Sequence, residues 1–161
     1  MVVALVISRM LAGAYFVWAG SAKLGRTQTF WSEIMGYGIV GPRAAGILAS
    51  VIIPVEFICG LFFAAGVSPV LTGSGLLALL VLFTLAMSIS LVRNTGNDCG
   101  CGAGAEKVRP VLIVRNAVLA VLVIGGMLPP APSYPGELIV LAVGTAAGVV
   151  IAVGSHRQLT Y

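Results

Sequence analysis

Two cysteines separated by one glycine, Cys99 and Cys101, lie in the stretch NDCGCGAGAEKVRP between two long apolar runs. Cysteines at i and i+2 have Cα atoms near the upper limit for a disulfide, and Gly100 lets the backbone bend enough to join them. The ring closed by such a disulfide is small and strained, so the bond is easily reduced. The spacing therefore favours a disulfide that forms and is reduced in a reaction over a structural disulfide that stabilises the fold.

The residues around this pair support thiol chemistry in part. Arg93, Lys107 and Arg109 favour the thiolate form of a nearby cysteine. Asp98, directly before the first cysteine, opposes it. A metal site is one alternative, but the loops nearby supply no further Cys or His, so we expect no metal. A turn in which the thiols are idle is the other alternative.

The composition of the chain indicates which solvent surrounds these cysteines. Of 161 residues, 59% are hydrophobic and 9% charged, and the mean hydropathy is +1.09, which leaves too little polar surface to coat a soluble globule. Five apolar runs, at about 2–21, 44–66, 70–92, 110–128 and 137–154, are each near the ~20 residues of a transmembrane helix. No segment alternates apolar and polar residues as barrel strands do. We expect one all-α integral membrane domain over 1–161.

The basic residues predict the orientation of this domain. With five crossings, the loops 22–43 and 93–109 and the C-terminal tail collect on one side, and all three contain Lys or Arg. The N-terminus and the other two loops contain none. The positive-inside rule then predicts a multi-pass protein of the cell (inner or plasma) membrane with its N-terminus outside. The loop of Cys99 and Cys101 and the C-terminus would be cytoplasmic. The net charge of +4 is thus a topology signal and needs no nucleic acid partner.

A short amphipathic segment, TQTFWSEIMGYGIVG, follows the first apolar run. Its apolar residues recur at helical spacing with polar residues between them, which predicts a short helix in the membrane interface. One interpretation is an anchor at headgroup depth, and the other is a lid over a lipid-soluble substrate. The apolar residues are Phe30, Trp31, Ile34, Met35 and Ile39.

Charged residues inside the apolar runs are costly and need a reason. Arg9 and Glu56 lie roughly 10 and 15 Å from the same outer surface at 1.5 Å per residue, so we predict that they form an ion pair. The pair would either fix the helix register or act on protons or a quinone head group. Arg115 can extend to the interface or turn toward the cysteine loop. Asn116 can form a hydrogen bond between helices.

The order of the segments AGSAKL, PVEFICGLFFAAG, CGC and RNAVL resembles the MauE family of methylamine-utilisation membrane proteins, within a wider DoxX-like group. The resemblance covers about residues 5–128 and implies four core transmembrane helices, to which 137–154 would add a fifth. It implies redox-associated work: thiol-disulfide exchange, or an accessory role in maturation of a partner redox enzyme. A thioredoxin-like protein or a larger redox complex is the implied partner, and a quinone is a candidate cofactor. The implied functional residues are Lys23, Glu56, Cys99, Cys101, Arg115 and Asn116.

One departure from the family pattern concerns the cysteine motif. The family continues this motif with Phe-Gly, whereas Gly102 and Ala103 follow Cys101 here, so the aromatic residue that would dock the loop is missing. Either the loop is more mobile or its redox activity has weakened. The second hypothesis is therefore a non-catalytic membrane subunit that anchors or assembles a larger respiratory or redox complex. The small residues Gly144 and Gly148 would suit helix-mediated assembly, including an oligomer.

Overall fold

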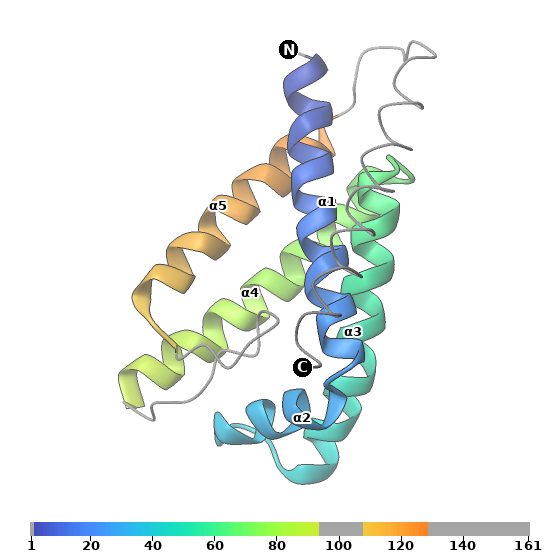
Figure 1. The fold of residues 1–161 in the computed structure, drawn as a ribbon. Coiled ribbons are helices and arrows are strands. Elements are labelled where there is room, and N and C mark those ends of the chain that lie inside the picture. Colours follow the sequence, from blue (N-terminus) through green and yellow to red (C-terminus); the bar gives the residue numbers. More distant parts are fainter. Residues whose placement is uncertain (1, 94–107, 129–161) are drawn as a thin grey trace, which may run out of the picture.

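A computed structural model describes residues 2–93 and 108–128. Five helices and no strand make up this described part (Figure 1). Cys99, Cys101, the apolar run 137–154 and the Gly144–Gly148 pair lie outside the described residues. The helices are α1 (Val2–Leu24), α2 (Thr27–Gly36), α3 (Pro42–Ala64), α4 (Pro69–Arg93) and α5 (Pro110–Met127).

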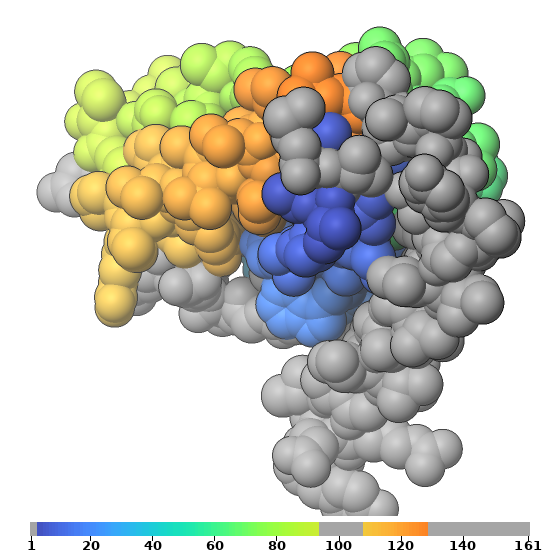
Figure 2. All heavy atoms as spheres, turned by 90° about the horizontal axis from the view of Figure 1, so that it is seen from above, coloured from blue at the N-terminus to red at the C-terminus, as the bar shows by residue number. Residues whose placement is uncertain are grey.

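Four of these helices, α1, α3, α4 and α5, are long and apolar enough to cross a membrane. They form a bundle in which each contacts two others, in the cyclic order α1, α3, α4, α5. Seen from above, α5 adjoins both α1 and α4 (Figure 2). Large apolar side chains such as Ile7, Leu71, Val81 and Val121 are exposed on the outside, which is what contact with lipid tails requires. The predicted all-α membrane bundle with four core helices is confirmed.

Local residues explain where these helices begin and end. Pro42 and Pro110 occupy the first turns of α3 and α5, where the missing N–H costs no hydrogen bond. The turn from α3 to α4 includes Gly66 at φ 72°, a conformation that glycine adopts without strain. Helix α1 continues to Leu24, past the predicted end of its apolar run at residue 21. Lys23 is therefore helical and not part of the first loop.

The close contact between α1 and α3 sets the register of the bundle. A Cβ atom on Gly13 would lie 2.7 Å from the Gly60 carbonyl oxygen, and one on Gly60 would lie 2.8 Å from Phe16 Cβ. Both distances are too short, so only glycine at these positions lets the two antiparallel helices approach this closely. In this register Lys23 lies level with Glu56, while Arg9 lies level with the turn after α3.

Helix α2 crosses the end of the bundle and packs on α3 (Figure 1). Phe30 is its buried anchor and packs against Ala49 and Ile52 of α3. The indole Nε1 of Trp31 donates a hydrogen bond of 3.1 Å to the Pro42 carbonyl oxygen. The predicted short helix is confirmed, and these contacts fix it against the first half of α3.

Candidate functional site

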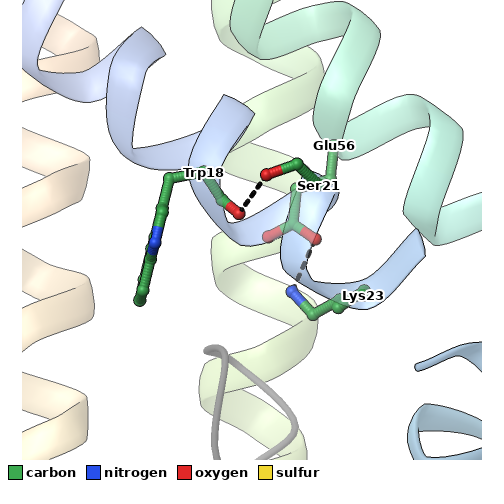
Figure 3. A network of polar contacts seen from close by, with 4 residues as sticks. All are labelled: Trp18, Ser21, Lys23 and Glu56. Carbon is green, nitrogen blue, oxygen red and sulfur yellow. Dashed lines mark hydrogen bonds and ion pairs between the residues drawn. The ribbon is translucent and has the colours of Figure 1, made fainter. Parts of the chain in front are cut away.

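Lys23 and Glu56 form a buried ion pair between α1 and α3. The Lys23 Nζ to Glu56 Oε2 distance is 2.6 Å, and each side chain is 2% exposed. Glu56 projects from α3 toward the last turn of α1, beside Ser21, whose hydroxyl donates to the Trp18 carbonyl oxygen at 2.8 Å (Figure 3). Two opposite charges at this depth each depend on the other, because water cannot replace a lost partner.

The predicted ion pair between Arg9 and Glu56 is wrong. Glu56 pairs with Lys23, and Arg9 lies close to Gly66, just beyond the end of α3. Gly66 is separated from Glu56 by about 15 Å of chain at helical rise, too far for the Arg9 side chain to bridge. The sequence-based estimate counted residues from the ends of the apolar runs, and it therefore placed Arg9 and Glu56 at similar depths in the membrane. The glycine contact between α1 and α3 instead shifts α1 so that its other cation meets the carboxylate.

Arg9 is held at the opposite end of the bundle by the last turn of α5. Its Nε donates a hydrogen bond of 2.9 Å to the Gly126 carbonyl oxygen, and its Nη2 donates one of 3.4 Å to the Leu128 carbonyl oxygen. The end of a helix carries partial negative charge on such carbonyl groups, so a buried guanidinium is a suitable partner. Arg9 therefore joins α1 to the end of α5, a contact that the sequence did not predict.

Two aromatic rings lie against the Lys23 ammonium group. Its Nζ atom is 5.4 Å from the ring centroid of Phe30 on α2 and 5.2 Å from that of Phe83 on α4. Both distances are within the range of a cation–π interaction, which is strongest where water is excluded. The ion pair thus connects α1 and α3 directly and meets α2 and α4 through these rings.

The same two rings also line a cavity between α2, α3 and α4. It has a volume of about 110 Å³. Its surface is apolar: Glu33 and Tyr37 are among the lining residues, but no polar atom faces the cavity. Helix α2 forms one wall, so the segment predicted as an anchor or a lid borders a space of ligand size. The lining residues are Phe30, Glu33, Ile34, Tyr37, Ile39, Val40, Leu48, Ile52, Leu82, Phe83 and Ala86.

The ends of α4 and α5 that flank the cysteine segment pack together. Met87 and Leu112 are buried there, with Phe83 and Val108 against them. One turn further along α5, the Asn116 Nδ2 donates a hydrogen bond of 3.1 Å to the hydroxyl oxygen of Thr84 on α4. The predicted hydrogen bond between helices is therefore confirmed.

Arg115 turns into the bundle, so the first of its two expected arrangements, extension to the membrane interface, is not found. Its guanidinium carbon lies 5.9 Å from the ring centroid of Tyr15 on α1. The Nε and Nη2 atoms are buried, so the side chain turns into the bundle and does not extend to the interface. The cysteine loop toward which it was alternatively expected to turn lies outside the described residues.

The sequence did not single out Phe83 or the cavity. Phe83 lies in the charge-free run 70–92, where it resembles any residue that faces lipid. Cys59, the third cysteine of the chain, is a free, half-buried thiol against the core cluster that includes Phe63 and Leu76. In the part of the chain that the structure describes, no group of three or more His, Cys, Asp or Glu side chains could hold a metal ion.

Comparison with known protein families matches residues 1–129 to the family described as methylamine utilisation protein MauE. Searches of curated proteins and of solved structures give no match. The family match includes all five helices, the buried ion pair and the segment with both cysteines, and it agrees with the resemblance noted over about 5–128. Because it extends over most of the chain, this multi-pass membrane protein belongs to the MauE family of methylamine utilisation proteins.

Proposed function

We propose that the chain performs thiol-disulfide exchange through Cys99 and Cys101, as an oxidoreductase or as an accessory subunit, during maturation of a partner redox enzyme. In the exchange, a partner dithiol becomes a disulfide, and its two electrons and two protons reduce the Cys99–Cys101 disulfide to a dithiol. Reoxidation of this dithiol transfers two electrons and two protons to the disulfide of a thioredoxin-like protein or to a quinone. Reoxidation restores the Cys99–Cys101 disulfide, so the electrons and protons of the cycle balance.

The main support is the position of the two helix ends that this cysteine segment joins. Arg93 ends α4, and Val108 precedes α5 and packs against Met87 and Leu112. Phe83 belongs to the same cluster and also contacts Lys23 of the buried ion pair. A bundle that only had to stay folded would be as stable with apolar residues in place of such a pair. Intramembrane ionisable residues instead mark functional sites, and this one adjoins the base of the cysteine segment.

The orientation belongs to the same proposal. The basic residues Lys23, Arg26, Arg43, Arg93 and Arg109 all belong to the end of the bundle at which α2 lies and the cysteine segment is attached. The positive-inside rule then gives a cytoplasmic exchange site in the cell membrane.

Redox trapping in cells tests the exchange. An oxidant is added, free thiols are alkylated after acid quenching, and Cys99→Ser and Cys101→Ser are compared with the wild type. We expect the wild-type pair to become resistant to alkylation and one single variant to retain a mixed disulfide with a partner. Cys59→Ser is the matched control and should behave as the wild type, because Cys59 packs in the core.

Two outcomes separate the alternatives. If the pair stays reduced under oxidant and neither variant alters partner thiols, the exchange proposal is wrong. Stable co-purification with larger subunits that is indifferent to both Ser variants would then favour a non-catalytic anchoring subunit. A membrane-impermeant maleimide should label the reduced pair only after the cells are opened. Labelling in intact cells would reverse the orientation.

A further inference from the structure

Three helices besides its own surround the ammonium group of Lys23. The Glu56 carboxylate reaches it from α3, the Phe83 ring from α4 and the Phe30 ring from α2 (Figure 3 shows the ion pair). With these groups in place, each side chain of the ion pair is 2% exposed. Helices α1, α3 and α4 are long enough to span the membrane, whereas α2 is short. The wall that can move at the lowest cost is therefore the one formed by α2.

Helix α2 has little stability of its own. It has ten residues, whereas an isolated helix needs roughly 12–15 residues to be more than marginally stable in water. No side-chain hydrogen bond caps its N-terminus, and its first turn contains no acidic residue to interact with the helix dipole. The position of α2 therefore depends on its contacts with the rest of the bundle.

A single buried side chain provides the main contact of α2. Phe30 is the buried residue of this helix, and its ring rests against both Lys23 and the apolar cluster of α3. The other attachment, the hydrogen bond from Trp31 to Pro42, is exposed, so water competes for it. A cation–π interaction is strongest where water is excluded, as it is at Lys23. Helix α2 is thus attached through the same buried charge that Glu56 neutralises.

The packing beneath α2 is incomplete. Among the described helices, the backbone of α2 contacts α3 and α1 but not α4. Residues of both α2 and α4 line the cavity of about 110 Å³, and no polar atom faces it. Atoms at the surface of a cavity lack contact partners on that side and lose the dispersion energy of those contacts. The side of α2 toward α4 therefore adds little to its attachment.

From these observations we infer that α2 is a movable cover for the Lys23–Glu56 ion pair, and that the charge of the pair holds this cover closed through Phe30. When α2 moves away, the ammonium group loses one of its two rings, and water and protons reach the pair. When α2 returns, Phe30 excludes them again. Neither Cys99 nor Cys101 takes part, so the cover is independent of the proposed thiol-disulfide exchange.

Acylation of Lys23 measures how often the cover opens. The purified full-length protein in lipid nanodiscs is treated briefly with acetic anhydride, and modification of Lys23 is followed by mass spectrometry of its peptides. The amine should react slowly in the wild type, because the reaction requires α2 to move. Phe30→Leu keeps an apolar side chain but removes the ring. We expect Lys23 to react about tenfold faster in this variant, which corresponds to about 1.4 kcal/mol, within the range of a desolvated cation–π interaction.

Phe63→Leu is the matched control for this measurement. Phe63 is fully buried in the core cluster that includes Phe16 and Leu76, so its replacement removes the same ring from the bundle at a site away from α2. Lys23 should react in Phe63→Leu at the wild-type rate. Should Phe30→Leu not fold, Phe30→Met removes the ring with a more adaptable side chain.

A second measurement separates the charge of the ion pair from the packing of Phe30. Lys23→Met combined with Glu56→Met removes both charges, leaves no uncompensated charge and keeps Phe30. The chain has two tryptophans, so a Trp18→Phe background isolates the emission of Trp31 on α2. We expect this emission to shift in the double variant as it does in Phe30→Leu, because the ring has lost its cation.

Three results would overturn the inference. Equal acylation of Lys23 in the wild type and in Phe30→Leu would show that α2 is not a cover. An equal rise in Phe63→Leu would show that the whole bundle loosens and that α2 has no special part. Unchanged Trp31 emission in the double variant would show that packing alone, and not the charge of the pair, holds α2 in place.

Discussion

Helix α1 buries two cations, and the two are neutralised in different ways. Near its start, the guanidinium of Arg9 donates to carbonyl oxygens at the end of α5, whose charges are partial and belong to the backbone. At its end, the ammonium of Lys23 meets the full charge of the Glu56 carboxylate and the faces of two phenyl rings. The first arrangement joins helix ends, while the second holds an ion pair beside a cavity.

The difference supports the proposed location of the exchange site at the Lys23 end of the bundle. A guanidinium that satisfies helix-end carbonyl groups completes hydrogen bonds that the fold leaves open in any case. An ion pair deep in an apolar bundle requires two costly charges where apolar residues would serve. The Lys23 end is also where α2 packs and where the cysteine segment begins and ends.

Loss of Lys23 should have the largest effect on stability. Lys23→Met leaves the Glu56 carboxylate buried without its partner, and we expect the free energy of unfolding to fall by about 3–5 kcal/mol. Unfolding in detergent micelles with increasing dodecyl sulfate measures this change. Lys23→Met combined with Glu56→Met should recover most of the loss, because no uncompensated charge remains.

Arg43→Met is the control for this prediction. Arg43 is an exposed basic residue at the start of α3, so its replacement should change stability by no more than about 0.5 kcal/mol. A double variant as unstable as Lys23→Met would mean that Lys23 acts through packing rather than through its charge.

Replacement of Arg9 should have a smaller effect. Arg9→Met removes hydrogen bonds from a charged donor to uncharged carbonyl groups, so the same unfolding measurement should show a loss of about 1.5–3 kcal/mol. Arg9→Lys keeps a cation near the end of α5 and should recover part of the loss. Trp31 emission adds a local reading: it should shift in Lys23→Met, where Phe30 loses its cation, and stay unchanged in Arg9→Met. Equal losses in the two variants would remove the distinction between the two ends.

The smallest effect is expected for a neutral contact between helices. Asn116→Leu removes the hydrogen bond to Thr84, and polar pairs between membrane helices average about 0.6 kcal/mol. A double-mutant cycle with Thr84→Val isolates this pair by the same unfolding measurement. A coupling as large as that of Lys23 with Glu56 would show that the ion pair is not exceptional among the polar contacts of the bundle.

Much of the fold follows from local features of the chain. Apolar runs of spanning length predicted the four long helices, and the spacing of Phe30, Trp31 and Ile34 predicted the short one. The predicted helix ends were wrong by a few residues where local residues set the boundary, as at the start of α3 at Pro42 and the end of α1 beyond Lys23. The cysteine pair and the orientation stay predictions, since both cysteines lie outside the described residues.

The site was less accessible to sequence reasoning. Asn116 was expected to bond between helices and does so. The buried carboxylate of Glu56 was recognised, but its partner was assigned by counting residues from the ends of apolar runs. That count assumes that helices begin at the same depth. Gly13 and Gly60 determine the actual offset of α1 along α3. Their positions in the sequence do not reveal the size of that offset.

The sequence by itself determined that this chain spans a membrane, since bilayer thickness and residue polarity act on each segment separately. It also determined which charged residues lie within membrane-spanning segments, where burial of a charge requires a compensating partner. Only the tertiary structure decided that Lys23 meets Glu56, that Arg9 binds the end of α5, and that Phe30 and Phe83 line the same cavity. These contacts join residues far apart in the chain, and they depend on how closely whole helices can approach, which no local pattern encodes.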